Sequence, residues 1–530
     1  MFTFDILTLN ALIVEQYDFL TGAIITKIQQ PTRREFIFAL RNSGKTKKLY
    51  INIDPQYYHT CFINEETYNK RLLTIPQKPP MFCMLLRKYL LNSKIEKVNI
   101  PQNERILEFY INSYNEIGEK IYLCLAIEFM GKHSNIILYS YDTNMIIGCA
   151  HNIGAEKSRE REIYGGLPYI YPPKQNKSDF LNYYGEINYE TLVQDFHMFS
   201  KGFAKLCQNK DLNTIKSYLK LENLSPSIEK NYDKYSLFSE LLEDKITFDS
   251  VNEMVDNYYS HHIFTNKIKS LKSQYSTIIK QKLKKNNKTV EQLKYQIHKS
   301  NNFDKYRLYG DLLMANMYQL KDFSNIAEVF DYENNNTIQI ELDNTKTIKD
   351  NANNYYKNYN KLKTSQNKLG EMLEQYLEKS MYYEQILYSI DIAQTTTDLA
   401  TIISEISGQV PESAEKKNKK SEITCIQKDE NTRIYIGKNN KQNDYIVSKL
   451  CSDEDLWFHV HSMPGSHILL KTQNITNELI LECAKIAKEY SIAKTSTKVG
   501  VIYTRCKYLK KPPKANLGYV TYKNEKEIVV

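Results

Sequence analysis

The sequence lacks the short motifs that mark most nucleotide-binding and hydrolytic sites. It has no G-x-S-x-G, G-x-G-x-x-G or H-E-x-x-H, and the G-K-T at residues 44–46 lacks the upstream glycine of a phosphate-binding loop. Its nine cysteines are scattered without any C-x-x-C pair, which argues against a zinc ribbon or a thioredoxin-type centre. An odd, unclustered count fits a reducing compartment.

Long apolar runs are also missing. No stretch approaches the 18 apolar residues that a membrane-spanning helix needs. The opening residues, MFTFDILTLNALIVEQ, carry Asp5 early and have no basic stretch before their apolar part, so they do not predict a secretory signal. We therefore expect a cytoplasmic protein without a membrane partner.

The chain is long and basic. Its 530 residues suggest three or four domains, and 42% hydrophobic residues can build their cores. A formal charge of +9 favours an acidic partner, with nucleic acid first. Because lysine is frequent throughout, only local clusters of charge are informative.

The pattern of apolar residues predicts a multidomain α+β fold. The first part alternates like strands around two helical stretches, ALIVEQYDFLTGA and PPMFCMLLRKYLLNSK, and continues as a β-meander to about residue 152. The next part predicts short helices without strands, with a tight helix-turn-helix around Gly202 or a plain helical linker as the two interpretations. The predicted domains are an α/β domain at 1–175, a small helical domain at 176–251, a long antiparallel coiled-coil arm at 252–410 and an α+β domain at 411–530.

Two long helical stretches predict the arm. In the second, positions 352, 355, 359, 362, 366, 369, 373, 376, 380, 383, 387 and 390 step by three and four, and ten of these twelve are apolar or aromatic. In the first, Phe264, Ile268, Leu271, Tyr275 and Ile278 keep this rhythm, which Leu283, Val290 and Ile297 resume in a shifted phase. A helix of about 45 residues spans roughly 70 Å, a length suited to bridging distant sites.

Basic residues cluster in two places. Residues 256–299 hold ten lysines against two acids, which fits either phosphate contact or a solvated helix face. Residues 494–514 hold seven Lys or Arg and no acid, with Tyr503 and Tyr508 between them. Lysines supply affinity for phosphates and aromatic rings can stack on bases, so this segment predicts nucleic-acid contact, with a solvated basic edge as the alternative.

The stretch DLWFHVHSMPGSHILLK at 455–471 holds the only tryptophan and three of the ten histidines. His459, His461 and His467 raise the possibility of a zinc or iron site, but no carboxylate at a suitable spacing completes one. We therefore interpret the stretch as strand, Pro-Gly turn and strand, with imidazoles that face RNA or bond within the domain. Around it, TRIYIGKNNKQNDYIVSKL predicts strand, turn and strand, ELILECAKIAKEYSIAK a helix, and VGVIYTRCKYL and LGYVTYKNEKEIVV closing strands.

Several stretches in the same order resemble the NFACT family. They are PPMFCMLLRKYL, ERILEF, EFMGKHSNIIL and SREREIYGGLPY in the first domain, YRLYGDLLMANMYQL and IELDNTKTIKDNANNYYKNYNKLK in the arm, and IGKNNKQNDYIVSKL, DEDLWFHVHSMPGSHILL and YLKKPP in the last domain. The resemblance implies an NFACT-N domain, a helix-hairpin-helix-like domain, a coiled-coil middle and an NFACT-R domain.

The resemblance also implies a function in ribosome quality control. Such proteins bind a large ribosomal subunit that still carries peptidyl-tRNA, recruit alanyl-tRNA and support untemplated alanine tailing of the nascent chain for degradation. Peptide-bond chemistry then belongs to ribosomal RNA, so no enzyme activity and no cofactor are implied, and the chain would act as a monomer on the ribosome. The alternative, from older descriptions of similar proteins, is a leaderless surface adhesin that binds fibronectin.

The resemblance assigns candidate residues position by position. The family's Asp-Arg pair for tRNA recruitment corresponds to Glu104 and Arg105, where the acid is one methylene longer, and a carboxylate beside an arginine can orient its guanidinium. The candidates for tRNA binding are Glu104, Arg105, Glu128, Lys132 and His133. The candidates for ribosome and RNA binding are Lys438, Asn440, Trp457, His459, His467, Lys507, Lys510 and Lys511.

Overall fold

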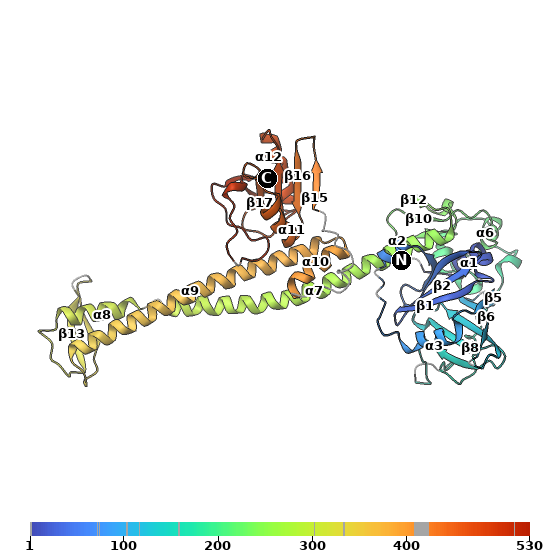
Figure 1. Cartoon of the computed structure of the whole chain (residues 1–530), viewed down its shortest axis with the longest axis horizontal. Helices are drawn as coiled ribbons and strands as arrows, with labels where there is room; N and C mark the ends of the chain where they lie inside the picture. The colour runs from blue at the N-terminus through green and yellow to red at the C-terminus, as the bar shows by residue number, and fades with distance from the viewer. Residues whose placement is uncertain are drawn as a thin grey trace. The chain divides into compact units, whose positions relative to one another are not determined.

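The computed structural model describes residues 3–71, 73, 75–101, 104–115, 117–156, 160–300, 303–331, 334–407, 423–513 and 515–530. The chain divides into two compact units, Met1–Lys267 and Ile268–Val530. Each unit packs around buried cores of its own. Figure 1 labels the helices and strands of both units. No helix in the described ranges is both long enough and apolar enough to cross a membrane.

A nine-stranded antiparallel sheet forms the first part of unit 1. Its order is β4-β3-β2-β1-β5-β6-β7-β8-β9. The strands are β1 Ile24–Thr32, β2 Glu35–Asn42, β3 Lys45–Asn52, β4 His59–Ile63, β5 Lys94–Asn99, β6 Ile106–Tyr114, β7 Lys120–Glu128, β8 Asn135–Ser140 and β9 Ile146–Cys149. Helices α1 Ile6–Leu20 and α3 Met81–Leu90 bury apolar residues in the main core of this unit, and a short α2 Glu65–Lys70 follows β4. The predicted helices and meander are confirmed.

The region after the sheet contains strands that were not predicted. Short helices α4 Leu192–Asp195, α5 Lys201–Leu206 and α6 Leu212–Leu219 precede a three-stranded sheet of β10 Ser227–Glu229, β11 Tyr235–Ser236 and β12 Lys245–Thr247. Strands of two or three residues are too short to show alternation, which is why the pattern missed them. Of the two interpretations of this region, the one with a turn at Gly202 does not hold, because Ser200 caps α5 by accepting from the backbone N–H of Phe203 and Gly202 lies inside the helix.

Two long helices dominate the arm. Helix α7 Val251–Ser300 begins in unit 1 and continues into unit 2, where an insert of α8 Asp304–Ala315, β13 Ile326–Asp331 and β14 Asn336–Glu341 precedes α9 Ile348–Ile392 and α10 Thr396–Ser407. Lys272 donates to the Asp391 carbonyl at 2.6 Å, and Asn286 donates to the Tyr376 carbonyl at 2.7 Å. As residue numbers rise along α7 they fall along α9, so the two helices are antiparallel (Figure 1).

The burial pattern follows the predicted seam. All twelve seam positions of α9 are buried or half-buried, and between residues 357 and 381 every residue outside the seam is exposed. The seam of α7 changes phase as expected, but through Ile279, which is fully buried, rather than Ile278, which is 39% exposed. Leu271, Tyr275, Ile279 and Leu283 follow one another by steps of four, and repeated steps of four are how a heptad seam shifts its phase.

The C-terminal part of unit 2 is a six-stranded antiparallel sheet in the order β15-β16-β18-β17-β19-β20. The strands are β15 Thr424–Gln427, β16 Arg433–Gly437, β17 Leu456–Val460, β18 His467–Lys471, β19 Gly500–Arg505 and β20 Lys526–Val529. Helix α12 Asn477–Glu489 packs Cys483, Ala484 and Ala487 into the core of this sheet. The strand-turn-strand predicted for DLWFHVHSMPGSHILLK and the helix predicted after it are confirmed.

The second strand predicted in IGKNNKQNDYIVSKL is wrong. Asn440–Tyr445 forms helix α11 and Ile446–Leu450 one π-helical turn. Asn439 caps this helix by accepting from the backbone N–H of Gln442, whose side chain accepts from the backbone N–H of Lys438. This reciprocal capping overrides the β-propensity of the Tyr-Ile-Val run.

Candidate nucleic-acid interfaces

In unit 1, Arg105 lies at the entry to β6, where Phe129 donates its backbone N–H to the Arg105 carbonyl at 2.8 Å. Nη1 of Arg105 donates to the Tyr58 hydroxyl at 2.9 Å, and the guanidinium lies over the Tyr58 ring, 5.6 Å from its centroid. Gly131 packs on the same ring, since a Cβ built there would be 3.8 Å from Tyr58 Cε1. Tyr58 therefore links the two predicted motifs, ERILEF and MGKHSN.

The structure places Lys132 and His133 in the 3-10 turn Gly131–His133, where both side chains are exposed. Glu104 is half-buried, and within the described residues its carboxylate makes no ion pair with Arg105. The group that orients Arg105 is thus Tyr58 and not the neighbouring carboxylate. Sequence reasoning did not find Tyr58, which lies 47 residues upstream.

Glu128 is placed where it cannot touch RNA directly. Its side chain is 0% exposed, pairs with Arg161 and accepts from the Tyr169 hydroxyl at 3.0 Å. Burial alone would favour loss of the Arg161 proton, but the contacts with Glu128 and Tyr169 outweigh it and raise the pKa of Arg161. Glu128 therefore holds Arg161 against the sheet, so a contribution of Glu128 to tRNA binding would be indirect, through Arg161 and Tyr169.

In unit 2, the three predicted RNA-facing rings pack on one another. The Trp457 ring stacks on His459 at 5.7 Å with an interplanar angle of 8°, and meets His467 edge-on at 5.1 Å. Burial lowers the pKa of His459 to about 4, and burial together with nearby His459 holds the pKa of His467 well below 6.5. Both imidazoles are therefore neutral at pH 7. Within the described ranges, no group of three or more His, Cys, Asp or Glu is placed to hold a metal ion.

Helix α9 is hydrogen-bonded to the Pro-Gly turn beside these rings. Gln385 donates to the Gly465 carbonyl at 2.8 Å and accepts from the Gly465 N–H at 2.9 Å. A Cβ at Gly465 would lie 3.2 Å from Ser491 Cβ, so only glycine fits without displacement. The side-chain amide of Gln385 thus joins the arm to the C-terminal sheet. No sequence pattern predicted this contact, which links residues 80 positions apart.

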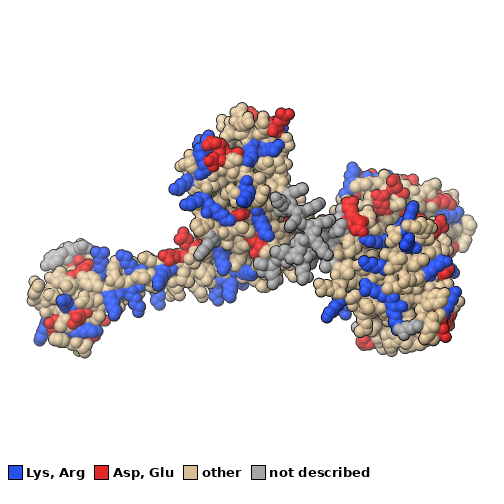
Figure 2. Space-filling view, viewed as in Figure 1, with Lys and Arg blue, Asp and Glu red and all other residues tan. Residues whose placement is uncertain are grey.

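The predicted basic residues divide by exposure. Lys507, Lys510 and Lys511 are exposed on one segment, Lys507 paired with Glu454 at 2.7 Å and Lys511 with Asp444. Lys438 is half-buried over the Tyr490 ring at 5.8 Å. Figure 2 shows Lys and Arg side chains, with acidic ones among them, on the visible face of the C-terminal part and along the arm. In helix α7, Lys280, Lys282, Lys284, Lys285 and Lys288 are exposed.

Asn440, Trp457 and His467 are at most 4% exposed. Asn440 donates to Glu405 at 2.9 Å and so ties α11 to α10. These three side chains cannot present themselves on the outer surface, and any RNA contact of Trp457 or His467 has to come through a cavity.

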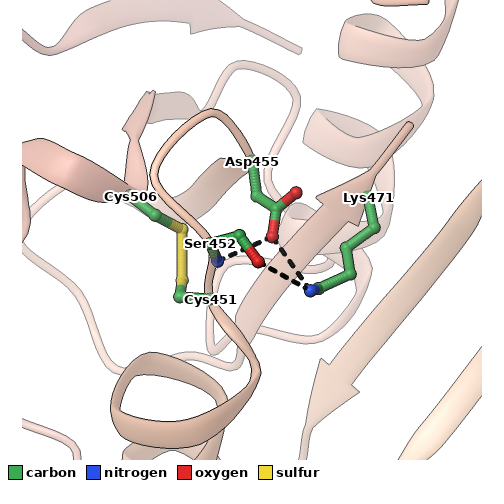
Figure 3. Close-up of a disulfide and its surroundings, with 5 residues drawn as sticks. All are labelled: Cys451, Ser452, Asp455, Lys471 and Cys506. Carbon is green, nitrogen blue, oxygen red and sulfur yellow. Dashed lines mark hydrogen bonds and ion pairs between the residues drawn. A yellow bond between two sulfur atoms is a disulfide. The ribbon is translucent and has the colours of Figure 1, made fainter. Parts of the chain in front are cut away.

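A disulfide holds the basic segment in place. Cys451 ends the π-helical turn and Cys506 begins the 3-10 turn Cys506–Tyr508, with their Cα atoms 5.9 Å apart (Figure 3). Asp455 receives the Ser452 N–H at 2.8 Å and pairs with Lys471 at 3.2 Å beside it. Because 55 residues separate the two cysteines, spacing alone could not pair them. The disulfide also differs from the reduced cysteines that their scattered positions led us to expect.

Family models match nearly the whole chain. The model for NFACT N-terminal and middle domains covers residues 5–208 and 208–423, and the model for the NFACT protein RNA binding domain covers residues 423–524. The chain belongs to the NFACT family. The RNA-binding domain of this NFACT protein thus contains the Trp457 cluster, the disulfide and the exposed lysines.

The chain is similar over almost its full length to curated NFACT relatives. It is 30% identical to "Rqc2 homolog RqcH" of Bacillus subtilis (strain 168) over 96% of this chain and 94% of that one. It is 29% identical to "Rqc2 homolog RqcH" of Streptococcus suis (strain 05ZYH33) over 100% and 98%. The solved N-terminal part of the fibronectin/fibrinogen-binding protein from Streptococcus suis is 28% identical over 49% of this chain and 100% of that one, with a TM-score of 0.43.

Proposed function

We propose that this NFACT protein is a ribosome quality-control factor that binds the large ribosomal subunit carrying peptidyl-tRNA. Near full-length similarity to RqcH supports this, together with an RNA-binding domain that exposes Lys507, Lys510 and Lys511. Exposed lysines provide sequence-independent affinity for the phosphates of ribosomal RNA.

Recruitment of alanyl-tRNA is the finer part of the proposal. The observation that carries it is the presentation of Arg105, whose guanidinium is held by Tyr58 next to exposed Lys132 and His133. An arginine whose fork is already oriented loses less conformational freedom when it binds a phosphate or a base edge. Three cationic or hydrogen-bonding groups at the end of two adjacent strands suit a tRNA backbone.

The chemistry of tailing would remain with the ribosome. The protein would act in the cytoplasm by positioning alanyl-tRNA for untemplated alanine addition, with ribosomal RNA forming each peptide bond.

Purification of the protein from cells, followed by sequencing of the bound RNA, tests the proposal. We expect enrichment of large-subunit ribosomal RNA and of one tRNA species. Absence of ribosomal RNA even at low salt would refute it, because lysine–phosphate contacts strengthen as salt is lowered.

Replacing Arg105 separates recruitment from ribosome binding. We expect Arg105→Ala to abolish alanine tails while large subunits still co-purify, and Tyr58→Phe, which keeps the ring but removes the hydroxyl contact, to shorten the tails. Arg41→Ala is the matched control, an exposed arginine on β2 of the same sheet. Tails of normal length in the Arg105 variant would contradict the assignment.

A further inference from the structure

A cavity of about 480 Å³ opens in unit 2 between α9 and the C-terminal sheet. Aromatic and imidazole rings from four segments line it, namely Tyr382, Trp457, His459, His467, Tyr519 and Tyr522. The volume falls in the range of sites that hold one small planar molecule or part of one.

The charge of the lining excludes a phosphate from the interior. Glu378 and Glu384 are its charged side chains, and no lysine or arginine lines it within the described residues. Since His459 and His467 are neutral at pH 7, they add no positive charge. The group that enters is therefore uncharged or cationic.

Two residues that line the cavity each carry a buried ring nitrogen with unused hydrogen-bonding capacity. Nε1 of Trp457 and Nδ1 of His467 have no partner among the described residues, and their residues are 1% and 4% exposed. The indole N–H can only donate. The backbone of Asn443 interacts with the His467 imidazole, and a neutral imidazole that donates through one nitrogen can accept through the other.

A hydrogen-bond donor and an acceptor among aromatic rings suit a nucleobase. The edge of a base carries both donors and acceptors, and its face stacks on aromatic rings. A guanidinium or ammonium group would satisfy the glutamates but could not accept from the Trp457 N–H, because such cations only donate.

Positive charge lies just outside the cavity. Lys510 exchanges two backbone hydrogen bonds of 2.8 Å with Thr521, which lines the wall, and its own side chain is exposed. Lys507 and Lys511 are exposed on the same segment. Rings inside and lysines outside are the arrangement by which proteins hold single-stranded nucleic acid, with bases stacked and phosphates on the rim.

We propose that this cavity receives one unpaired nucleobase of the bound RNA while the adjoining phosphates follow Lys507–Lys511. The inference rests on the RNA-binding role proposed above, and adds that the domain selects RNA with an extruded base over fully paired RNA.

The single tryptophan makes a direct test possible in the unmodified full-length protein. Two RNA hairpins are compared that are identical in length and charge, one with a single bulged nucleotide and one with an abasic residue at the bulge. We expect the bulged base to change Trp457 emission and to bind roughly five- to 150-fold more tightly, the range for stacking one base. Equal affinity and equal emission for both hairpins would overturn the inference.

Variants assign the effect to the cavity. His459→Ala is expected to remove the advantage of the bulged base, whereas Lys510→Ala should weaken both hairpins equally. His461→Ala is the matched control, because His461 is exposed, pairs with Glu527 at 3.1 Å and does not line the cavity. If His459→Ala unfolds at the same temperature as wild type and still binds the bulged hairpin more tightly than the abasic one, the assignment to this cavity is overturned.

Three further outcomes distinguish a failure of this inference from a failure of the proposed function. If neither hairpin binds at low salt and no ribosomal RNA co-purifies, the RNA-binding role itself fails. If both hairpins bind but the base makes no difference, only the cavity assignment fails. If N-acetyl-arginine amide changes the emission and the bulged RNA does not, the cavity takes a cationic protein side chain and the inference is overturned.

Discussion

The buried ion pair between Arg71 and Asp256 offers the sharpest test of how the root of the arm is held in unit 1. Asp256 is in the second turn of α7, and Arg71 follows α2. The guanidinium is fully buried, with Nη2 2.7 Å from Asp256 Oδ1 and Nε 3.0 Å from Ser260 Oγ. The start of α7 is thereby bonded to the sheet domain through one charged side chain.

A neutral histidine completes the cluster. His59 Nε2 lies 3.0 Å from Arg71 Nη1, and its Nδ1 lies 2.6 Å from the Tyr57 carbonyl. Burial first, and then the charge of Arg71, hold the pKa of His59 well below 6.5. The imidazole therefore donates through Nδ1 and accepts from Arg71 through Nε2, so it cannot replace the negative charge of Asp256.

We expect Asp256→Asn to destabilise unit 1 by about 3–5 kcal/mol, because it leaves the buried Arg71 charge without a counter-charge. Arg34→Ala is the matched control: Arg34 pairs with Asp54 at 3.0 Å, but the two side chains are 47% and 31% exposed. Losing such a surface pair costs about 0–1 kcal/mol. Replacing both partners, as Arg71→Met with Asp256→Leu, should recover most of the loss.

Hydrogen exchange of the full-length protein measures the effect locally. Amides of the first turns of α7 should exchange about 100-fold faster or more in Asp256→Asn, since each 1.4 kcal/mol corresponds to a factor of ten in the opening equilibrium. The single tryptophan lies in unit 2. The denaturant concentration at the midpoint of the unfolding transition that its emission reports should therefore stay the same. A loss no larger than that of Arg34→Ala would refute the reasoning and show that the pair is hydrated.

Two further predictions concern unit 2. A cross-link closing a loop of 55 residues stabilises by roughly 4 kcal/mol, so Cys451→Ser should lower the unfolding free energy by about 2–4 kcal/mol and Cys425→Ser by little. Alkylation of the unfolded, unreduced protein should modify seven cysteines, and modification of all nine would contradict the pairing with Cys506. The folded pKa values of His459 and His467 lie below the unfolded value of 6.5, so their contribution to stability is complete above pH 6.5 and is lost as pH falls. The unfolding free energy, measured by tryptophan emission in denaturant, should fall by up to about 1.4 kcal/mol per pH unit for each imidazole. An unfolding free energy that stays constant from pH 6.5 to 5 would contradict the burial of both imidazoles as neutral rings.

Patterns of local period were read correctly from the sequence. The seam of α9 was predicted residue by residue, because a solvated helix shows its buried face at every third or fourth position. Seven strands of the first sheet and the β17–β18 hairpin were predicted, because their residues alternate clearly between apolar and polar. Strands β4 and β5 were not predicted. The motifs of the chain also indicated its family, which the match over residues 5–524 confirms.

Short or capped segments were misread. The strands β10, β11 and β12 have two or three residues each and show no period. The helix after β16 depends on Asn439, whose side chain satisfies a free backbone N–H that β-propensity does not take into account.

The sequence by itself determined the family, the domain classes and the positions of the candidate RNA-binding residues, because each of these follows from short continuous stretches of the chain. Only the tertiary structure decided what those residues can do. Tyr58, and not Glu104, orients Arg105, and Gln385 brings α9 against the turn beside Trp457. Such contacts join residues 47 and 80 positions apart, and distances of that kind follow from how whole elements pack and leave no periodic trace in the chain.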